Sequence, residues 1–256
     1  MLHSHMGLDP EFDGKACQTV HGNAGGTHFH RNSIFISTNH ALRHGGMTFV
    51  HNGLDPSVYP EPDFSSRGRS VAFLAKAAWK VKNVRRAIRI ARRAGRPLEV
   101  LGGHRLNLKM GFRLTLDANA RFHGMVDDAK KAAVLGRSAG LLFPVRWHEP
   151  FGLAIIEGMY FGLPIFATPY GAIPEIVPEF AGCLSDSGEA LVEAIGDLDR
   201  YDGPAIHQHF RENFTADVMA RRYLGLYERI EAGESLHAAG FTARASAGKV
   251  ILPWNE

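Results

Sequence analysis

Two glutamates in one apolar stretch have the residue type and the spacing to bind hydroxyl groups or to act as an acid–base pair. Glu149 and Glu157 stand in LLFPVRWHEPFGLAIIEGMYFGLPIFATPYGAIPEIV, residues 141–177, with seven residues between them. The stretch reads as strand, polar loop, helix and strand, and residues 152–160 are apolar nearly all round, which predicts a helix buried against a sheet. A buried carboxylate is costly unless a donor meets it. Glu157 therefore indicates either a structural hydrogen bond to a loop amide or a contact with a ligand.

The start of this helix has the features of an anion site. Phe151, Gly152 and Leu153 form its first turn, where free N–H groups and the positive end of the helix dipole favour an anion. Gly152 lets a ligand approach the backbone. Leu153 and Glu157 are four residues apart, so Glu157 shares the face that rises toward this turn. An anion-binding end flanked by two carboxylates fits a phosphorylated polyol such as a nucleotide sugar.

The segment from Glu149 to Glu157, EPFGLAIIE, resembles the E-x(7)-E motif of the retaining glycosyltransferases of the group 1 (family 4) type. GLPIFATPYGAIPEIV resembles the segment that follows in that family, and the spacing, the FG pair and the later G-x-x-P-E all agree. The resemblance implies that Glu149 hydrogen-bonds hydroxyls of a donor sugar and that Glu157 hydrogen-bonds ribose hydroxyls. Neither would then be a nucleophile, and burial of one carboxylate beside an anion site also disfavours a hydrolase with a carboxylate pair.

Two lysines in FLAKAAWKVKN, Lys76 and Lys82, resemble the cations that bind the donor pyrophosphate in this family. Fixed cations help most where charge develops in the transition state, here on the leaving nucleoside diphosphate. Lys76 stands where arginine is common and offers a point charge instead of a fork, and Ala75 replaces a frequent glycine. Both changes could weaken phosphate binding. The alternative, a solvated basic helix face, applies best to the arginines between residues 85 and 93.

The resemblance also assigns positions on the two sides of a cleft. His21 in VHG stands where the family places a histidine near the donor sugar, and a purely structural histidine is the equal alternative. Met125 and Val126, just after FHG, stand where the backbone of the family touches the nucleobase. A backbone contact does not reveal which base is bound.

Three other patterns are weaker. His28 and His30 would share one face of a strand, but no cysteine or carboxylate cluster supports a metal site there. Gly102–Gly103 lacks the remainder of a dinucleotide fingerprint, which argues against a nicotinamide enzyme. The D-x-D pattern at residues 197–199 stands at the end of an amphipathic helix without a preceding strand, as in a solvated helix end.

Composition sets the broad class and the compartment. The 256 residues are 45% hydrophobic and 21% charged with a net charge of +3, an ordinary globular balance. The positive charge is concentrated in residues 76–96, and no nucleic-acid motif accompanies it, so phosphate binding is the first interpretation. Cys17 and Cys183 lack metal-ligand spacing and indicate reduced thiols in a cytoplasmic protein. No apolar run is long enough to span a membrane, although peripheral membrane contact stays open.

Strands and helices alternate after residue 70, with strands expected at 71–74 and 98–101 and a helix at 84–93, which predicts an α/β fold. Residues 35–41, FISTNHA, resemble a late strand of the acceptor-side domain in the same family. We expect a Rossmann-like parallel sheet with helices on both faces, the C-terminal domain of a GT-B protein, and a partial second Rossmann-like domain before it. Five ranges describe the expected organisation: a partial acceptor-side domain at 1–51, a turn-rich linker at 52–69, the nucleotide-sugar domain at 70–205, a C-terminal helix at 206–232 and a tail of uncertain order at 233–256. Because the family's acceptor-side domain is longer, the chain resembles a fragment or a protein that has lost half of that domain.

The implied reaction is transfer of a sugar, with retention, from a UDP-, GDP- or ADP-linked donor to a hydroxyl of a glycan, lipid or small molecule. It would need no metal ion and no other cofactor. The main alternative is a non-catalytic donor-binding module, or a subunit that depends on a missing half or on an oligomeric partner. A phosphorylase or a nucleotide-sugar epimerase on the same fold is a third class.

Overall fold

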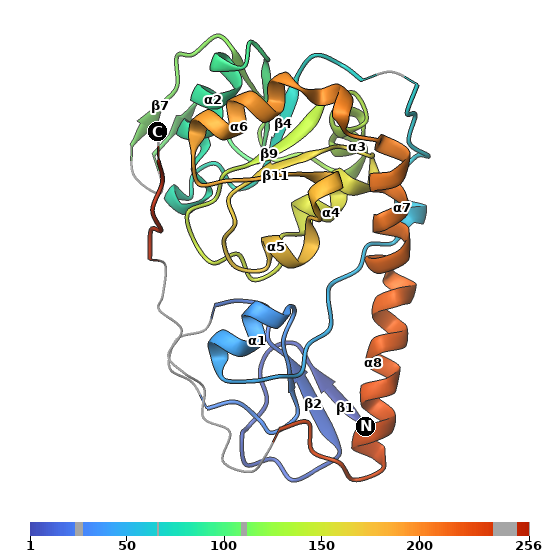
Figure 1. The fold of residues 1–256 in the computed structure, drawn as a ribbon. Coiled ribbons are helices and arrows are strands. Elements are labelled where there is room, and N and C mark those ends of the chain that lie inside the picture. Colours follow the sequence, from blue (N-terminus) through green and yellow to red (C-terminus); the bar gives the residue numbers. More distant parts are fainter. Residues whose placement is uncertain (24–27, 66, 109–111, 238–249, 256) are drawn as a thin grey trace.

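A computed structural model describes residues 1–23, 28–65, 67–108, 112–237 and 250–255. The chain forms a larger lobe, at the top of Figure 1, and a smaller lobe, at the bottom. One long helix, α8 (Ala216–Glu231), starts beside the larger lobe and runs down along the smaller one. The N-terminus lies on the smaller lobe, and the last described residues return to the larger lobe.

The larger lobe is built on a six-stranded parallel sheet. The strand order is β11-β10-β9-β4-β5-β8, and every neighbouring pair runs parallel. A parallel sheet needs apolar residues on both faces, and the central strands meet this need because β4 and β9 are made almost wholly of buried residues. The strands are β4 (Val71–Leu74), β5 (Leu98–Leu101), β8 (Ala120–Phe122), β9 (Gly140–Phe143), β10 (Ile165–Ala167) and β11 (Gly182–Leu184).

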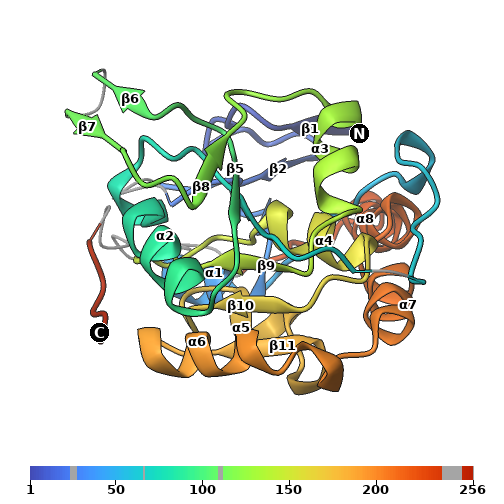
Figure 2. The same ribbon diagram turned by 90° about the horizontal axis from the view of Figure 1, so that it is seen from above.

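Helices cover both faces of this sheet (Figure 2). On one face α2 packs against α6, and on the opposite face α4 packs against α7. Short 3₁₀ turns and a small antiparallel hairpin of β6 (Leu106–Asn107) and β7 (Arg113–Leu114) complete the lobe. The helices are α2 (Val84–Arg93), α3 (Asp128–Leu135), α4 (Leu153–Tyr160), α5 (Ile173–Ile176), α6 (Gly188–Gly196) and α7 (Gly203–Asn213).

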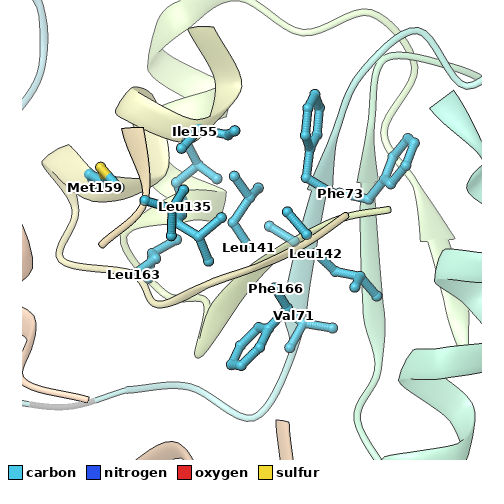
Figure 3. Close-up of a cluster of buried hydrophobic side chains, with 14 of the residues drawn as sticks. Val71, Phe73, Leu135, Leu141, Leu142, Ile155, Met159, Leu163 and Phe166 are labelled. Carbon is cyan, nitrogen blue, oxygen red and sulfur yellow. The ribbon is translucent and has the colours of Figure 1, made fainter. Parts of the chain in front are cut away.

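The core between the sheet and α4 fixes the helix that carries Glu157. Leu141 of β9 lies beside Ile155 of α4 and Leu135 of α3 in Figure 3. Gly158 allows close packing, because a Cβ atom there would come within 3.1 Å of the side chains of Ile165 and Leu141. Ile155, Ile156 and Met159 are completely buried. The helix is therefore held against the sheet along its length.

The smaller lobe has a three-stranded parallel sheet with the order β1-β2-β3. The strands are β1 (Leu2–Ser4), β2 (Ala16–Thr19) and β3 (Ser33–Ile34), and α1 (Thr38–His44) follows them. Helix α8 completes this lobe, because Tyr223 and Ile230 pack with Cys17, Ile34 and Val50 in one apolar cluster. A lobe of this size buries little apolar surface by itself, so α8 supplies part of its core.

The α/β class, the parallel sheet and its helices on both faces confirm the expectation from the sequence. The match is closest in the first half of the large sheet, where β4, α2 and β5 have the expected bounds. The hairpin β6–β7 and helix α1 were not expected. Residues 35–41 had suggested a continuing strand, but Ser37 accepts a hydrogen bond from His40 N and starts a helix there.

The C-terminal region also differs in detail. The range 206–232, expected to hold the C-terminal helix, contains two helices, α7 and α8, that are separated at Phe214 and Thr215, and Thr215 caps the second. The expected tail at 233–256 lies partly outside the described residues, namely 238–249 and 256. Of its described part, His237 packs on the smaller lobe and Asn255 pairs with Ser187 of the larger one. None of the described helices has the length and the apolar composition needed to cross a bilayer.

Candidate functional site

Glu149 lies in the loop between β9 and α4 and is held by two donors. Its Oε2 accepts from Lys82 Nζ at 2.5 Å and from Trp147 Nε1 at 2.7 Å. The side chains of Lys82 and Glu149 are only 12% and 9% exposed, so this is a nearly desolvated ion pair. Lys82 Nζ also lies 5.0 Å from the ring centre of Phe143 and 4.8 Å from that of Trp147. The lysine is thus held in a cage of aromatic rings and carboxylate.

The backbone of Glu149 is fixed by the loop after β10. Ala172 N donates to Glu149 O at 2.9 Å, and Gly171 pairs with Glu149 in an isolated parallel bridge. Gly171 has φ +72°, and a Cβ atom there would lie 2.3 Å from Glu149 O and 2.4 Å from Glu149 N. The glycine of the G-x-x-P-E segment therefore allows the contact that positions Glu149.

The first turn of α4 starts directly after this loop. Gly152 caps the helix with φ +100°, a conformation that favours glycine. Phe151 is buried and Leu153 is half exposed. No described residue accepts a hydrogen bond from the N–H groups of Gly152 and Leu153. The turn thus presents free backbone donors, as the sequence predicted.

Glu157, one turn further along α4, is also nearly buried, with 9% exposure. Its Oε1 accepts from the hydroxyl of Tyr59 at 3.0 Å and from Lys131 Nζ, which also pairs with Asp128 at 2.8 Å. Burial, together with the nearby Glu157 charge, raises the pKa of Tyr59 to about 12. Burial alone would lower the pKa of Lys131, but its hydrogen bonds to Asp128 and Glu157 outweigh this and raise the pKa. Glu157 thus faces a cation and a neutral phenol.

The two glutamates share one arrangement. In each carboxylate, one oxygen accepts both protein donors: Oε2 in Glu149 and Oε1 in Glu157. The other oxygen of each has no donor among the described residues. An ionised carboxylate has about four acceptor sites. Each glutamate is therefore anchored by the protein and keeps an acceptor oxygen for a ligand.

The remaining expected donor-side residues lie on loops that follow the strands of the large sheet. Lys76 follows β4, is exposed, and has its Nζ 5.5 Å from the ring centre of Trp79. Met125 is 76% exposed, and Val126 is partly buried. Their loop is tied to the one after β5, because the N–H groups of Gly102 and Gly103 both donate to Gly124 O. In an open parallel sheet ligands bind outside the carboxyl ends of the strands, which is where these loops lie.

His21 comes from the smaller lobe and belongs to a stack of histidines. Its Nε2 lies 2.9 Å from His5 Nδ1, and the rings of His5 and His3 stack at 4.4 Å. Burial, and then the neighbouring His5, lower the pKa of His21. His5 and His21 line a hollow of about 270 Å³ on the smaller lobe, together with Asn23 and Phe29.

The two lobes are joined by hydrogen bonds next to Glu149. Glu175 of the larger lobe accepts hydrogen bonds from Thr38 N at 2.8 Å and from Asn39 N at 2.6 Å, both in the first turn of α1 in the smaller lobe. Asn23, on the rim of the His21 hollow, donates to His148 O at 2.8 Å. Ser37 donates to Pro150 O at 2.8 Å. The loop that carries Glu149 is therefore clamped on both sides of that residue by the smaller lobe.

The patterns with weaker support are not brought to this site. His30 donates to the carbonyl of Phe12 in the smaller lobe, and Asp197 is the C-cap of α6. The described residues contain no group of three or more His, Cys, Asp or Glu side chains that could hold a metal ion. Cys17 and Cys183 are free thiols.

Several site residues were missed by sequence reasoning. Tyr59 and Lys131 reach Glu157 from far along the chain, and nothing local to them signals the contact. Trp147 and Glu175 stand inside the segment that was singled out, but no role was assigned to them. The matching G-x-x-P-E spacing could have pointed to Glu175.

Comparisons with known proteins agree with this arrangement. A model of the family described as glycosyl transferases group 1 matches residues 68–199. The O-antigen chain mannosyltransferase C of Escherichia coli is 29% identical over 151 residues, which are 54% of this chain and 40% of that protein. A probable sucrose-phosphate synthase of Thermosipho melanesiensis is 31% identical over 113 residues, 41% of this chain and 27% of that protein. The chain thus spans well under half the length of these two relatives.

Solved structures of similar fold cover more of the chain. AviGT4, a glycosyltransferase involved in avilamycin A biosynthesis, has a TM-score of 0.73 at 18% identity. The match covers 91% of this chain and 75% of the AviGT4 chain. HepE of Anabaena, in complex with UDP-glucose, has a TM-score of 0.65 at 16% identity and covers 85% and 71%. At this identity the likeness shows the fold, which is that of the GT-B glycosyltransferases.

The family model spans the large sheet from just before β4 to the end of α6 and includes both glutamates, both lysines and the loop of Gly171. The chain belongs to the family of group 1 glycosyl transferases.

Proposed function

We propose that this chain binds a nucleoside-diphosphate sugar and transfers its sugar to a hydroxyl group, with retention of the anomeric configuration. The observation that carries the proposal is the pair of anchored carboxylates, each with one oxygen left for a ligand, on either side of a helix start with free N–H groups. A sugar and a ribose present hydroxyl donors at the two ends of a diphosphate. Glu149 would accept from the sugar and Glu157 from the ribose.

The diphosphate would lie between the first turn of α4 and the two lysines. Lys76 is exposed, and Lys82 uses one of its three N–H donors on Glu149, so two remain for phosphate oxygens. The N–H groups of Gly152 and Leu153 add the helix dipole. These groups would stabilise the charge that develops as the bond to the leaving phosphate breaks, and we propose that no metal ion takes part.

The reaction breaks the bond between the anomeric carbon and the phosphate oxygen, whose electron pair leaves with the nucleoside diphosphate. The acceptor hydroxyl forms the new bond on the same face of the sugar. Its proton passes to the leaving phosphate oxygen, so no side chain is required as a base. His21 and Asn23 border the hollow on the opposite lobe, which is where an acceptor would approach.

HepE was solved with UDP-glucose, so UDP-sugars are the first donors to test, followed by GDP- and ADP-sugars. Calorimetric titration of the chain should detect one bound donor. Glu157→Gln should weaken the affinity for the donor about tenfold, because a hydrogen bond to a charged group contributes roughly 1.5–3 kcal/mol. Glu193→Gln, on the distant helix α6, is the matched control and should leave the affinity unchanged. Equal affinities for wild type and Glu157→Gln would contradict the assignment.

A second function is favoured by the small size of the lobe that would face the donor site, because the described residues of that lobe form a three-stranded sheet. A donor-binding module without turnover would retain the carboxylate site and lack an acceptor site. It would bind the donor, lose affinity in Glu157→Gln, and release neither transferred sugar nor free nucleoside diphosphate.

A further inference from the structure

The β6–β7 hairpin exposes a row of apolar side chains. Leu106 and Leu114 pair directly across its two strands, and residues opposite each other on antiparallel strands point to the same side. Leu108, Phe112 and Leu116 lie close to the ends of these two short strands and are exposed as well. The exposed fractions of these five side chains range from 51% to 83%. The hairpin projects from the rim of the larger lobe, away from α7 and α8 (Figure 2).

A cavity of about 430 Å³ lies beside this hairpin, between Phe112, the turn at Trp79 and the start of α2. Among the described residues, its lining includes three cations, Lys80, Arg85 and Arg146, and no acidic residue. Within the described part of the chain, Lys80 and Arg85 form no ion pair. Arg146 is fixed by a 2.7 Å bond from Nε to Leu252 O. The cavity is therefore a cationic hollow with an apolar rim.

This hollow is separate from the proposed donor site. Glu149, Glu157, Lys76 and Lys82 do not line it. The proposed sugar transfer does not use the exposed leucines or these three cations. The hairpin side chains and the cavity together, called the hairpin face, are therefore candidates for binding a different ligand. Contiguous exposed apolar surface on a protein commonly marks an interaction site.

We infer that this face docks on an anionic phospholipid bilayer, with headgroup phosphate in the cationic hollow and the hairpin leucines at the acyl boundary. Apolar side chains next to cations are the combination by which peripheral proteins lie on charged membranes. Four of the five exposed apolar side chains are leucines, whereas proteins bind single-stranded nucleic acid by stacking its bases on aromatic side chains. A symmetric dimer through this face would bring the same cations against each other, because a two-fold interface pairs a patch with itself.

Two double variants of the full chain test the two halves of the face. Leu108→Ser with Phe112→Ser removes apolar surface, and Lys80→Ala with Arg85→Ala removes charge. Leu224→Ser and the pair Arg221→Ala with Arg222→Ala are the controls. They change an exposed leucine and two exposed arginines on α8, on the opposite side of the molecule. Circular dichroism melting of each variant checks that it is folded.

Co-sedimentation with vesicles is the measurement. Wild type should pellet with phosphatidylcholine vesicles that contain about a third phosphatidylglycerol, and not with phosphatidylcholine alone. The apolar double variant should bind at least about tenfold more weakly. The charge double variant should bind about 25-fold more weakly, since each of the two basic residues contributes about fivefold. Both controls should bind like wild type, and binding should weaken as salt rises.

Absence of wild-type binding to the anionic vesicles would overturn the inference. So would unchanged binding by either folded double variant. Binding of a single-stranded oligonucleotide that survives the serine changes but not the alanine changes would reassign the face to nucleic acid. Donor affinity, measured on the same variants, should stay unchanged, so that a failure here is distinguishable from a failure of the proposed transferase.

Discussion

Lys82 Nζ lies 2.5 Å from Glu149 Oε2, and both side chains are almost shielded from water. The pair joins the loop after β4 to the loop after β9, at the carboxyl ends of two adjacent strands of the large sheet. This ion pair within the candidate site therefore also stabilises the fold of the larger lobe. A cation expected to meet phosphate is thus already positioned by a carboxylate expected to meet sugar.

Breaking this pair should destabilise the protein. Lys82→Met leaves Glu149 buried without its cation, and removal of one partner of a buried pair costs about 3–5 kcal/mol. Urea unfolding should show this loss. The control Lys15→Met removes the cation of the exposed Lys15–Glu231 ion pair, whose N–O distance is 2.9 Å. It should change the free energy of unfolding little, since exposed ion pairs contribute little to stability. Similar losses in both variants would contradict the shielding of the Glu149 pair.

Gly171→Ala should distort the backbone of Glu149. The new Cβ would meet Glu149 O at 2.3 Å on a residue with φ +72°, so we expect a loss of more than about 3 kcal/mol in the free energy of unfolding. Gly95→Ala is the matched control, because Gly95 has φ +66° and nothing within 4 Å of the added Cβ. Its cost should be only that of the backbone conformation, about 1 kcal/mol. Equal costs would show that the contact with Glu149 carries no strain.

Glu175→Gln should loosen the junction between the lobes. The side-chain amide keeps one acceptor oxygen, so one of the N–H groups of Thr38 and Asn39 loses its partner. Amide hydrogen exchange at these two residues should speed up about tenfold, as expected for the loss of a charge-assisted bond. Glu179→Gln, an exposed neighbour, should leave the exchange rates as they are. Unchanged exchange at Thr38 and Asn39 in Glu175→Gln would show that the junction does not depend on this carboxylate.

Acid should destabilise the smaller lobe through His40. Burial, and then the neighbouring His44, lower the pKa of His40 to about 3, while the unfolded chain keeps the ordinary value near 6.5. Between these values the unfolded state binds a proton that the folded state does not. Stability is therefore complete above about pH 6.5 and falls as the pH drops toward 3, by roughly 1.4 kcal/mol per pH unit for one such group.

The variant His40→Gln isolates this group. The neutral ring donates from Nε2 to Gly22 O at 3.0 Å and receives from Ile36 N at Nδ1, and glutamine can replace the first of these bonds without titrating. Urea unfolding between about pH 4.5 and 7.5 should give a shallower loss of stability with acid than in wild type. A slope equal to that of wild type would show that His40 does not carry the acid sensitivity.

The parts of the fold that the sequence predicted are those with strong local periodicity. Strand β4, helix α2 and strand β5 have the expected bounds because buried strands and an amphipathic helix alternate there. Helix α1 was missed because it depends on the cap at Ser37 and not on an apolar stripe.

For the candidate site, sequence patterns singled out the glutamates, the lysines and the helix start, because these stand in one segment or in a recognisable motif, and their roles stay a prediction. They could not supply the partners. Tyr59 is 98 residues from Glu157 and Lys131 is 26 residues from it, so only the packing of α3 and the linker against α4 brings these groups together. The clamp of Glu175 on α1 likewise depends on how the lobes meet. Contacts of this kind leave no local pattern.

Transfer itself is the most direct test of the central claim. The chain would be incubated with each UDP-, GDP- or ADP-sugar of defined anomeric configuration and a panel of hydroxyl acceptors, and the product would be examined by NMR. The proposal predicts release of the nucleoside diphosphate and a product with the donor's anomeric configuration, and turnover that is lost in Glu149→Gln and insensitive to EDTA. A product of inverted configuration, or tight donor binding with no turnover on any acceptor, would contradict it.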